Sequence, residues 1–279
     1  MWKVLLILIL PFLAFSKDLL LVSVYPFYDV VKGIAGESFK VETLMPPNAD
    51  YHLYEVTPED VLKIAKAKVV FLSGIPLGGW EHKIERIALH KAVKLSEGIK
   101  IIRDNERGRN DPHLWMSPRV MKRIALNVFR KLKTMYPHKA EYLEKNYIDT
   151  VHKLRELDSQ YMEVLSRCKF RVVPLSHPTL GYLARDYGLE QFSLSLGSVH
   201  GGFYPKEISK LVHLLQERGV DFFFEIYGEE SKLGSILKAR YGLKVYSINA
   251  KIIPTSRYRD YFSIMEHNLS VLREALRCR

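Results

Sequence analysis

The chain has 279 residues, of which 47% are hydrophobic and 26% are charged, and this balance is ordinary for a globular protein with one large domain or two lobes. Its formal net charge is +11. Acidic and basic residues nevertheless alternate at helical spacing in segments such as KAEYLEKNY, so we expect a solvated surface and no nucleic acid as a partner.

Residues 1–16 have the organisation of a secretory signal peptide. A short basic start precedes the apolar run VLLILILPFLAF, and Ala14 and Ser16 are small residues near the expected cleavage point. The run is short for a transmembrane helix, which needs about 20 apolar residues. No cysteine lies nearby that could carry a lipid. We therefore expect cleavage before Lys17 and a free periplasmic protein, with an uncleaved N-terminal anchor as the alternative.

From Lys17 to Arg103 the sequence alternates between β-rich runs and amphipathic segments, which is typical of a parallel sheet with helices on both faces. Thr57, Pro58 and Asp60 form a helix start, with Thr as the N-cap and an acidic residue at the third helical position. The expected strands are residues 19–27, 39–47, 68–74, 91–95 and 99–103, and the expected helices are 28–37, 57–67 and 81–89.

Two helices are expected next, and then the alternation resumes. Residues 117–137 form a long helical pattern that Pro137 ends, and residues 138–168 continue without Gly or Pro. The apolar positions of this second segment keep no clean heptad, so we expect one long helix that spans two lobes and not a coiled coil. Later strands are expected at 170–176, 189–195, 220–226 and 243–249, and helices at 179–188, 205–219, 231–242 and 258–276.

Three histidines each lie in a separate turn that contains proline. They are His52 in PPNADYHLYEVTP, His113 in NDPHLWMSP and His177 in LSHPTLGYLA. Imidazole is the commonest protein ligand for borderline divalent metals. Ligands of open α/β sheets bind beyond the carboxyl ends of strands, where His52 and His177 are expected and where Glu225 and Asn249 end two further strands. The sequence therefore predicts a metal site that the fold assembles from distant segments.

Several other residues admit two interpretations. Asp111 either orients the His113 ring or begins the turn before Pro112. Glu225, at the end of an all-Phe strand, is either a ligand or a buried, hydrogen-bonded acid. We expect Trp115 and Tyr54 to shape the loops by packing. The remaining histidines, His82, His90, His138, His152, His213 and His267, lie on charged helical stretches, and we expect them at the surface.

The chain has two cysteines, Cys168 and Cys278. Export makes a disulfide chemically possible. Two cysteines in a helix-to-strand junction and a C-terminal tail do not fix a framework, so the sequence leaves their bonding open.

At these motifs the sequence resembles the zinc/manganese solute-binding proteins of bacterial metal ABC transporters, solute-binding protein family 9. The resemblance covers nearly the whole chain after Lys17. Residues 47–58 match the family's first ligand loop around His52, and residues 111–115 match its Asp-Pro-His-x-Trp motif. Residues 177–189 match its His-x-x-x-Gly-Tyr segment and the Tyr-Gly-Leu that follows, and the long linking helix is also typical of the family.

The resemblance implies an α/β fold with two similar lobes, each a parallel sheet flanked by helices, joined by one long linking helix with a metal cleft between them. It implies a signal peptide at 1–16, an N-terminal lobe at 17–137, the linking helix at 138–167 and a C-terminal lobe at 168–279. The implied function is a monomeric periplasmic receptor. It would bind a divalent metal and deliver it to an inner-membrane ABC permease that has a cytoplasmic ATPase.

The resemblance also implies that His52, His113 and His177 ligate the metal. Many members have a ligating Asp after the last C-lobe strand, and this chain has Asn249 there. The fourth ligand is therefore open between Asn249, Glu225, water and the histidine of the SVHGGFYP segment, His200.

Three neutral imidazoles suit Zn²⁺, Cu²⁺ or Ni²⁺ better than Mn²⁺, which prefers oxygen donors. The resemblance implies zinc among these, because family members with His at the third ligand position, here His177, look like zinc receptors. A manganese or iron receptor is the alternative. Because ligating histidines must be neutral, affinity should fall below about pH 6.5. The long helix should also limit bending, so we expect only a small movement between the lobes.

Two other functions compete with a receptor. Three histidines and a water also form a catalytic zinc site, but no HExxH motif is present. The sequence places no carboxylate as an obvious general base, although Glu225 could serve. A metal-binding adhesin active in cell adhesion would need no permease. We expect a receptor and no enzymatic activity.

Overall fold

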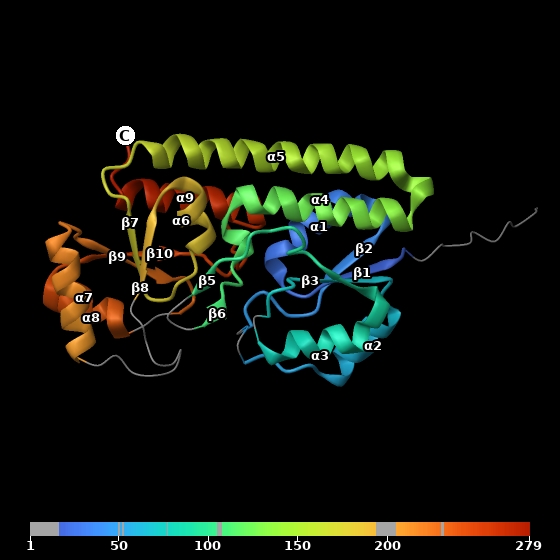
Figure 1. Cartoon of the computed structure of the whole chain (residues 1–279), viewed down its shortest axis with the longest axis horizontal. Coiled ribbons are helices and arrows are strands. Elements are labelled where there is room, and N and C mark those ends of the chain that lie inside the picture. Colours follow the sequence, from blue (N-terminus) through green and yellow to red (C-terminus); the bar gives the residue numbers. More distant parts are fainter. Residues whose placement is uncertain are drawn as a thin grey trace, which may run out of the picture.

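The computed structural model describes residues 17–49, 51, 53–76, 78–104, 108–193, 205–229 and 232–279. Two four-stranded parallel sheets form two lobes, and helix α5 (Ala140–Ser166) runs along both of them (Figure 1). The two-lobed α/β architecture and the long helix are therefore confirmed. None of the described helices is long and apolar enough to cross a membrane.

The N-terminal lobe contains a sheet whose strand order is β2-β1-β3-β4. Its strands are β1 (Leu19–Val22), β2 (Lys40–Thr43), β3 (Val69–Leu72) and β4 (Ala92–Lys94). Helices α1 (Tyr28–Ala35) and α4 (Pro118–Met135) pack with α5, and α2 (Pro58–Lys66) packs with α3 (Gly79–Ala88) on the other side of the sheet (Figure 1). The Thr57 hydroxyl and the Asp60 carboxylate cap α2 reciprocally, as the sequence predicted.

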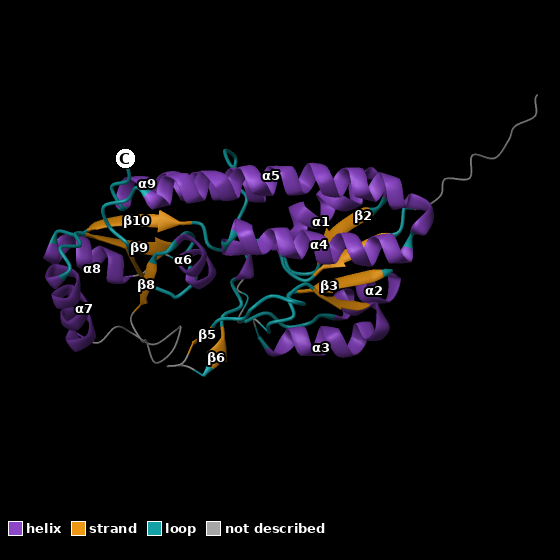
Figure 2. Cartoon of the chain, turned by 45° about the horizontal axis from the view of Figure 1, so that its top comes forward, coloured by secondary structure: helices purple, strands orange, loops and turns teal. Residues whose placement is uncertain are grey.

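The C-terminal lobe repeats this plan with the strand order β10-β9-β7-β8. Its strands are β7 (Val172–Leu175), β8 (Glu190–Ser193), β9 (Phe222–Ile226) and β10 (Lys244–Ile248). Its helices are α6 (Gly181–Tyr187), α7 (Pro205–Glu217), α8 (Lys232–Tyr241) and α9 (Tyr261–Ala275). Helices α6 and α9 contact α5, whereas α7 and α8 lie together at the far end of the lobe (Figure 2).

One strand prediction is wrong. Residues 99–103 do not continue the N-terminal parallel sheet, which ends at β4. Only β5 (Arg103–Asp104) forms, and it pairs antiparallel with β6 (Arg109–Asn110). Gly98 turns the chain at φ +70°. The Ile102 carbonyl oxygen then accepts the Asp111 N–H within the N-terminal lobe (2.8 Å), and the Ile102 N–H donates to the Tyr182 hydroxyl of the C-terminal lobe (3.3 Å). This segment therefore joins the lobes and does not widen the sheet.

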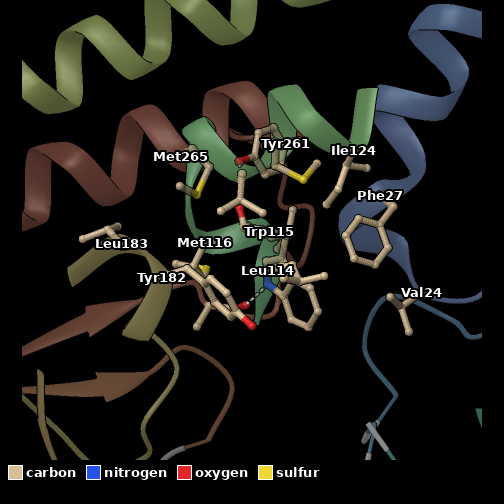
Figure 3. Packing of buried hydrophobic residues seen from close by; sticks show 14 of the residues in the cluster. Val24, Phe27, Leu114, Trp115, Met116, Ile124, Tyr182, Leu183, Tyr261 and Met265 are labelled. Carbon is tan, nitrogen blue, oxygen red and sulfur yellow. Dashed lines mark hydrogen bonds between the residues drawn. The ribbon is translucent and has the colours of Figure 1, made fainter. Parts of the chain in front are cut away.

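The two lobes share one continuous apolar core. Its centre is the turn Leu114–Met116, which lies between Phe27 of the N-terminal lobe and the C-terminal residues Tyr182 and Tyr261 (Figure 3). The Tyr261 hydroxyl donates to the carbonyl oxygen of Trp115 at 2.8 Å, and both side chains are fully buried. Moving the lobes apart would expose this packing, which is worth about 25 cal/mol for each Å² of apolar surface.

A disulfide links Cys168 and Cys278, which answers the question that the sequence left open. It ties the segment after α5 to the C-terminal end of the chain, and the two cysteines also lie in an antiparallel β-bridge. The bond closes a loop across a sequence separation of 110 residues, and a closed loop of this size restricts the unfolded chain strongly.

Asp29 lies at a second contact between the lobes. This α1 carboxylate accepts the backbone N–H of Tyr261, at the start of α9, at 2.7 Å. Burial raises the pKa of Asp29 to about 6, and the nearby Asp260 carboxylate adds to the effect, against the hydrogen bonds from Tyr261 and Tyr25 that lower it. The folded protein therefore favours the neutral carboxyl because of burial, although the hydrogen bond from Tyr261 by itself favours the charged form.

Candidate metal centre

His113 is held by its own turn. The carboxylate oxygen Oδ1 of Asp111 lies 2.7 Å from His113 Nδ1 and accepts the His113 backbone N–H at 2.9 Å. Both residues are buried. Asp111 therefore does both things that the sequence suggested, since it forms the turn and orients the ring. With Nδ1 on the carboxylate, Nε2 is the nitrogen that a metal would bind.

Asp111 also lies in close contact with the opposite lobe. The Tyr182 hydroxyl donates to the Asp111 carbonyl oxygen at 2.8 Å. Gly181, the first residue of α6, lies so close that a Cβ there would collide with Asp111 Oδ2. The glycine of the third motif is thus needed for the close approach of α6 to the carboxylate that orients His113.

His177 follows strand β7 and comes before α6, as the strand-end rule predicts. Its ring centroid lies 5.9 Å from that of His113, and the two ring planes are 81° apart. Two imidazoles that share one zinc ion, with Zn–N bonds of about 2.0–2.1 Å, would have centroids about 5–6 Å apart. The two rings, one from each lobe, therefore fit a shared metal ion.

His52 and His200 lie outside the described residues. The residue before His52, Tyr51, is buried and lines the same cavity as His113 and His177. Its hydroxyl donates to the Lys251 carbonyl oxygen at 2.9 Å, and its own carbonyl accepts from the Trp80 indole at 2.7 Å. Among the described residues, no three His, Cys, Asp or Glu side chains gather to hold a metal ion.

Asn249 holds a loop closed. Its Oδ1 accepts the Ile253 N–H at 2.9 Å, and its Nδ2 donates to the Ile253 carbonyl oxygen at 2.8 Å. Within this loop Ile252 has φ +54°, a left-handed conformation that is strained for a β-branched residue. In this loop the Ala250 carbonyl oxygen also accepts a hydrogen bond from the Trp115 indole N–H at 2.7 Å.

Glu225 also has a structural contact. Its carboxylate accepts the Gly234 N–H of α8 at 3.1 Å, and a Cβ at Gly234 would collide with it. In this structure the side chains of Glu225 and Asn249 therefore bond to nearby backbone, and the described residues that form the cavity wall do not include them.

The cavity that contains the two histidines holds about 330 Å³, including the part open to solvent. Tyr51, Trp115, Ile226 and Ala250 give it apolar walls. Its polar groups besides the histidines are Thr179, Glu229 and Lys251, which the sequence analysis missed. Glu229 lies three residues beyond the end of β9, and Lys251 lies three residues beyond the end of β10. The strand-end rule therefore carried a signal for both residues.

Comparisons with known proteins agree with this geometry. Residues 20–275 match the family model described as zinc-uptake complex component A, periplasmic. The zinc-binding protein AdcA of Streptococcus pyogenes is 26% identical over 94% of this chain and 56% of its own length. The high-affinity zinc uptake system protein ZnuA of Bacillus subtilis is also 26% identical, over 90% of this chain and 85% of its own.

The chain thus spans about half the length of its AdcA relatives. A crystal structure of the Zn(II)-bound ZnuA-like domain of Streptococcus pneumoniae AdcA superposes with a TM-score of 0.81 at 25% identity, covering 94% of this chain and 99% of that one. The family match extends over nearly all of the described residues. The chain therefore belongs to the family of periplasmic A components of zinc-uptake complexes.

Proposed function

We propose that the chain is a high-affinity receptor for a divalent metal ion, with zinc as its cargo, and that it delivers the ion to an inner-membrane ABC permease that has a cytoplasmic ATPase. The observation that carries this proposal is the pair of imidazoles, His113 from one lobe and His177 from the other, at a separation that fits one shared ion. His52 would be the third ligand, since its neighbour Tyr51 lines the same cavity.

Zinc is favoured by the donor chemistry and by the relatives. Neutral imidazoles suit zinc, whereas manganese and iron(II) sites use more carboxylate and carbonyl oxygen. Both curated relatives described above are named for zinc binding or zinc uptake. The manganese or iron receptor is the alternative that a metal competition experiment would decide.

The cargo would be held by residues that are already in position. Asp111 fixes the tautomer of His113, so that Nε2 is deprotonated and can bind an ion. Trp115 and Tyr51 exclude water from one side of the cavity, which strengthens the bonds between ion and ligands. The shared core between the lobes supports a small movement on loading, so release would depend on the cavity groups more than on a wide opening.

The same proposal covers the chain's export and its division into segments. We take residues 1–16 as a cleaved signal peptide, 17–137 and 168–279 as the lobes, and 138–167 as the linking helix. The disulfide between Cys168 and Cys278 supports an oxidising compartment such as the periplasm.

A receptor is favoured over a zinc hydrolase because the described carboxylate at the cavity, Glu229, is paired with Lys251 at 2.7 Å and is a poor general base in that state. An adhesin would retain the metal site without needing a permease. Neither alternative has a cavity feature of its own in its favour.

The test is a competition titration of the metal-free protein with Zn²⁺, Mn²⁺ and Fe²⁺ against a chelator, alongside His113→Ala and the surface variant His152→Ala. One tight zinc site that is lost in His113→Ala and retained in His152→Ala is the expected result. Equal zinc affinities of the wild type, His113→Ala and His152→Ala would refute the receptor proposal. Tighter binding of Mn²⁺ than of Zn²⁺ would make manganese the cargo.

A further inference from the structure

An ion pair lies in the wall of the histidine cavity. Lys251 Nζ is 2.7 Å from Glu229 Oε1, and the Lys251 side chain is 18% exposed while that of Glu229 is 37% exposed. Both residues line the cavity that His113 and His177 line. A lysine beside a site for a dication is unfavourable by Coulomb's law unless an anion accompanies it. The pair therefore has a direct bearing on any cation in this cavity.

The backbone brings these two residues together from neighbouring strands. Glu229 follows β9 in a tight turn, in which its N–H donates to the Ile226 carbonyl oxygen at 2.9 Å and Gly228 has φ +78°. Lys251 follows the adjacent strand β10, and its carbonyl oxygen is held by the Tyr51 hydroxyl. The two side chains therefore meet at the carboxyl edge of the C-terminal sheet, beside His177.

A third group points to an additional polar ligand at this side of the cavity. The Thr179 hydroxyl is buried, and it has no hydrogen-bond partner within the described part of the chain. A buried hydroxyl that lines a cavity gains a hydrogen bond from a bound water or from an oxygen ligand of an ion. The wall near Thr179 thus suits a bound ion and its oxygen donors.

We propose that Glu229 supplies a carboxylate oxygen to the bound metal ion and that Lys251 competes with the metal for this carboxylate. This inference rests on the proposed receptor function. In this structure Glu229 is paired with Lys251 and, among the described residues, is not gathered with the two histidines. When metal binds, the Glu229 carboxylate must therefore leave Lys251 and turn toward the ion, and when metal leaves, the ammonium takes the carboxylate back. The competition lowers the affinity below that of a free carboxylate and speeds release, which suits a protein that must hand over its cargo.

Two substitutions separate the roles of these side chains. Glu229→Gln keeps the shape of the side chain and removes the anion, so zinc affinity should fall about tenfold or more. Lys251→Met keeps the apolar stem and removes the competitor, so zinc should bind about threefold to tenfold more tightly and dissociate more slowly. The Tyr51 bond to Lys251 uses the backbone carbonyl, so Lys251→Met leaves it intact.

The experiment measures zinc affinity and chelator-triggered release in the wild type, both variants and the double variant, together with the visible absorption spectrum of the Co²⁺-loaded proteins. The Co²⁺ spectrum reports the ligands themselves, so Glu229→Gln should change it. Glu144→Gln is the matched control, because it removes one anion from the exposed Lys133–Glu144 pair (3.1 Å) on α4 and α5. It should leave affinity, release and spectrum unchanged.

An unchanged Co²⁺ spectrum in Glu229→Gln, or an affinity no different from that of Glu144→Gln, would overturn the inference. The receptor function would still stand if His113→Ala lost the site in the same experiment. If His113→Ala bound as tightly as the wild type, the proposed function itself would fail. If Lys251→Met binds and releases zinc as the wild type does, the proposed competition by Lys251 is refuted, and the role of Glu229 as a ligand still stands.

Discussion

Asp29→Asn should make the folded state more stable at neutral pH. The Asp29 carboxylate accepts the Tyr261 N–H between the lobes, and burial raises its pKa from 3.8 to about 6. An asparagine oxygen can accept the same hydrogen bond without carrying a charge into this partly buried position. The substitution therefore removes the cost of ionisation and retains the contact.

The sign and size of the effect follow from proton linkage. Between about pH 4 and pH 6 the folded protein holds the Asp29 proton more tightly than the unfolded chain does, so this group's contribution to stability decreases as the pH rises. A pKa difference of about two corresponds to about 3 kcal/mol, and partial exposure reduces this to about 2 kcal/mol. Wild type and Asp29→Asn should thus be nearly equal at pH 4 and differ by that amount at pH 7.

The assay is guanidinium unfolding of both metal-free proteins from pH 4 to pH 7 at constant ionic strength, taking the difference in unfolding free energy at each pH. Taking the difference between the two proteins cancels the contribution of the groups that titrate in the same way in both. Asp149→Asn, on the exposed surface of α5, is the control for a simple change of net charge. A difference that does not vary with pH, or a wild type that gains stability relative to Asp29→Asn as the pH rises, would refute the reasoning.

Three further predictions concern the support of His113, the disulfide and the loop that Asn249 closes. Asp111→Asn should weaken zinc binding about 10–100-fold, and Gly181→Ala should do the same because its Cβ would displace the Asp111 carboxylate. A chelator titration measures the affinities, and equal affinity in both variants and the wild type would contradict this prediction. Replacing Cys278 by Ser should cost about 2–5 kcal/mol in denaturant unfolding, and a midpoint equal to that of the oxidised wild type would be inconsistent with a stabilising bond. Asn249→Ala removes both side-chain bonds to Ile253 and should cost about 1–3 kcal/mol, whereas a stability equal to that of the wild type would show that the strained loop needs no such support.

Features that depend on neighbouring residues were predictable from the sequence. The Thr57–Asp60 capping box and the contact of Asp111 with His113 each connect residues no more than three positions apart, so the local pattern carries the whole signal. The alternation of strands and helices predicted both lobes for the same reason. The strand prediction for residues 99–103 failed because Ile99, Ile101 and Ile102 are partly buried against the core without joining the sheet, and propensity alone does not distinguish such a segment from a strand.

Features that depend on how distant segments meet were not predictable. The sequence indicated that residues after β9 and β10 would face the ligand, but only the adjacency of these strands pairs Glu229 with Lys251. The position of Asn249 suggested a ligand, and the folded loop instead uses its amide to bond Ile253. Whether Asn249 or Glu225 reaches the metal in the loaded protein stays a prediction.

The most direct test of the account is a crystal structure of the zinc-loaded protein with anomalous data at the zinc edge. We expect one strong peak in the cavity, about 2.0–2.1 Å from His113 Nε2 and from a nitrogen of His177, with His113 Nδ1 still on Asp111. A peak bound only to surface histidines, or a loaded cavity in which His113 and His177 do not share the ion, would contradict it.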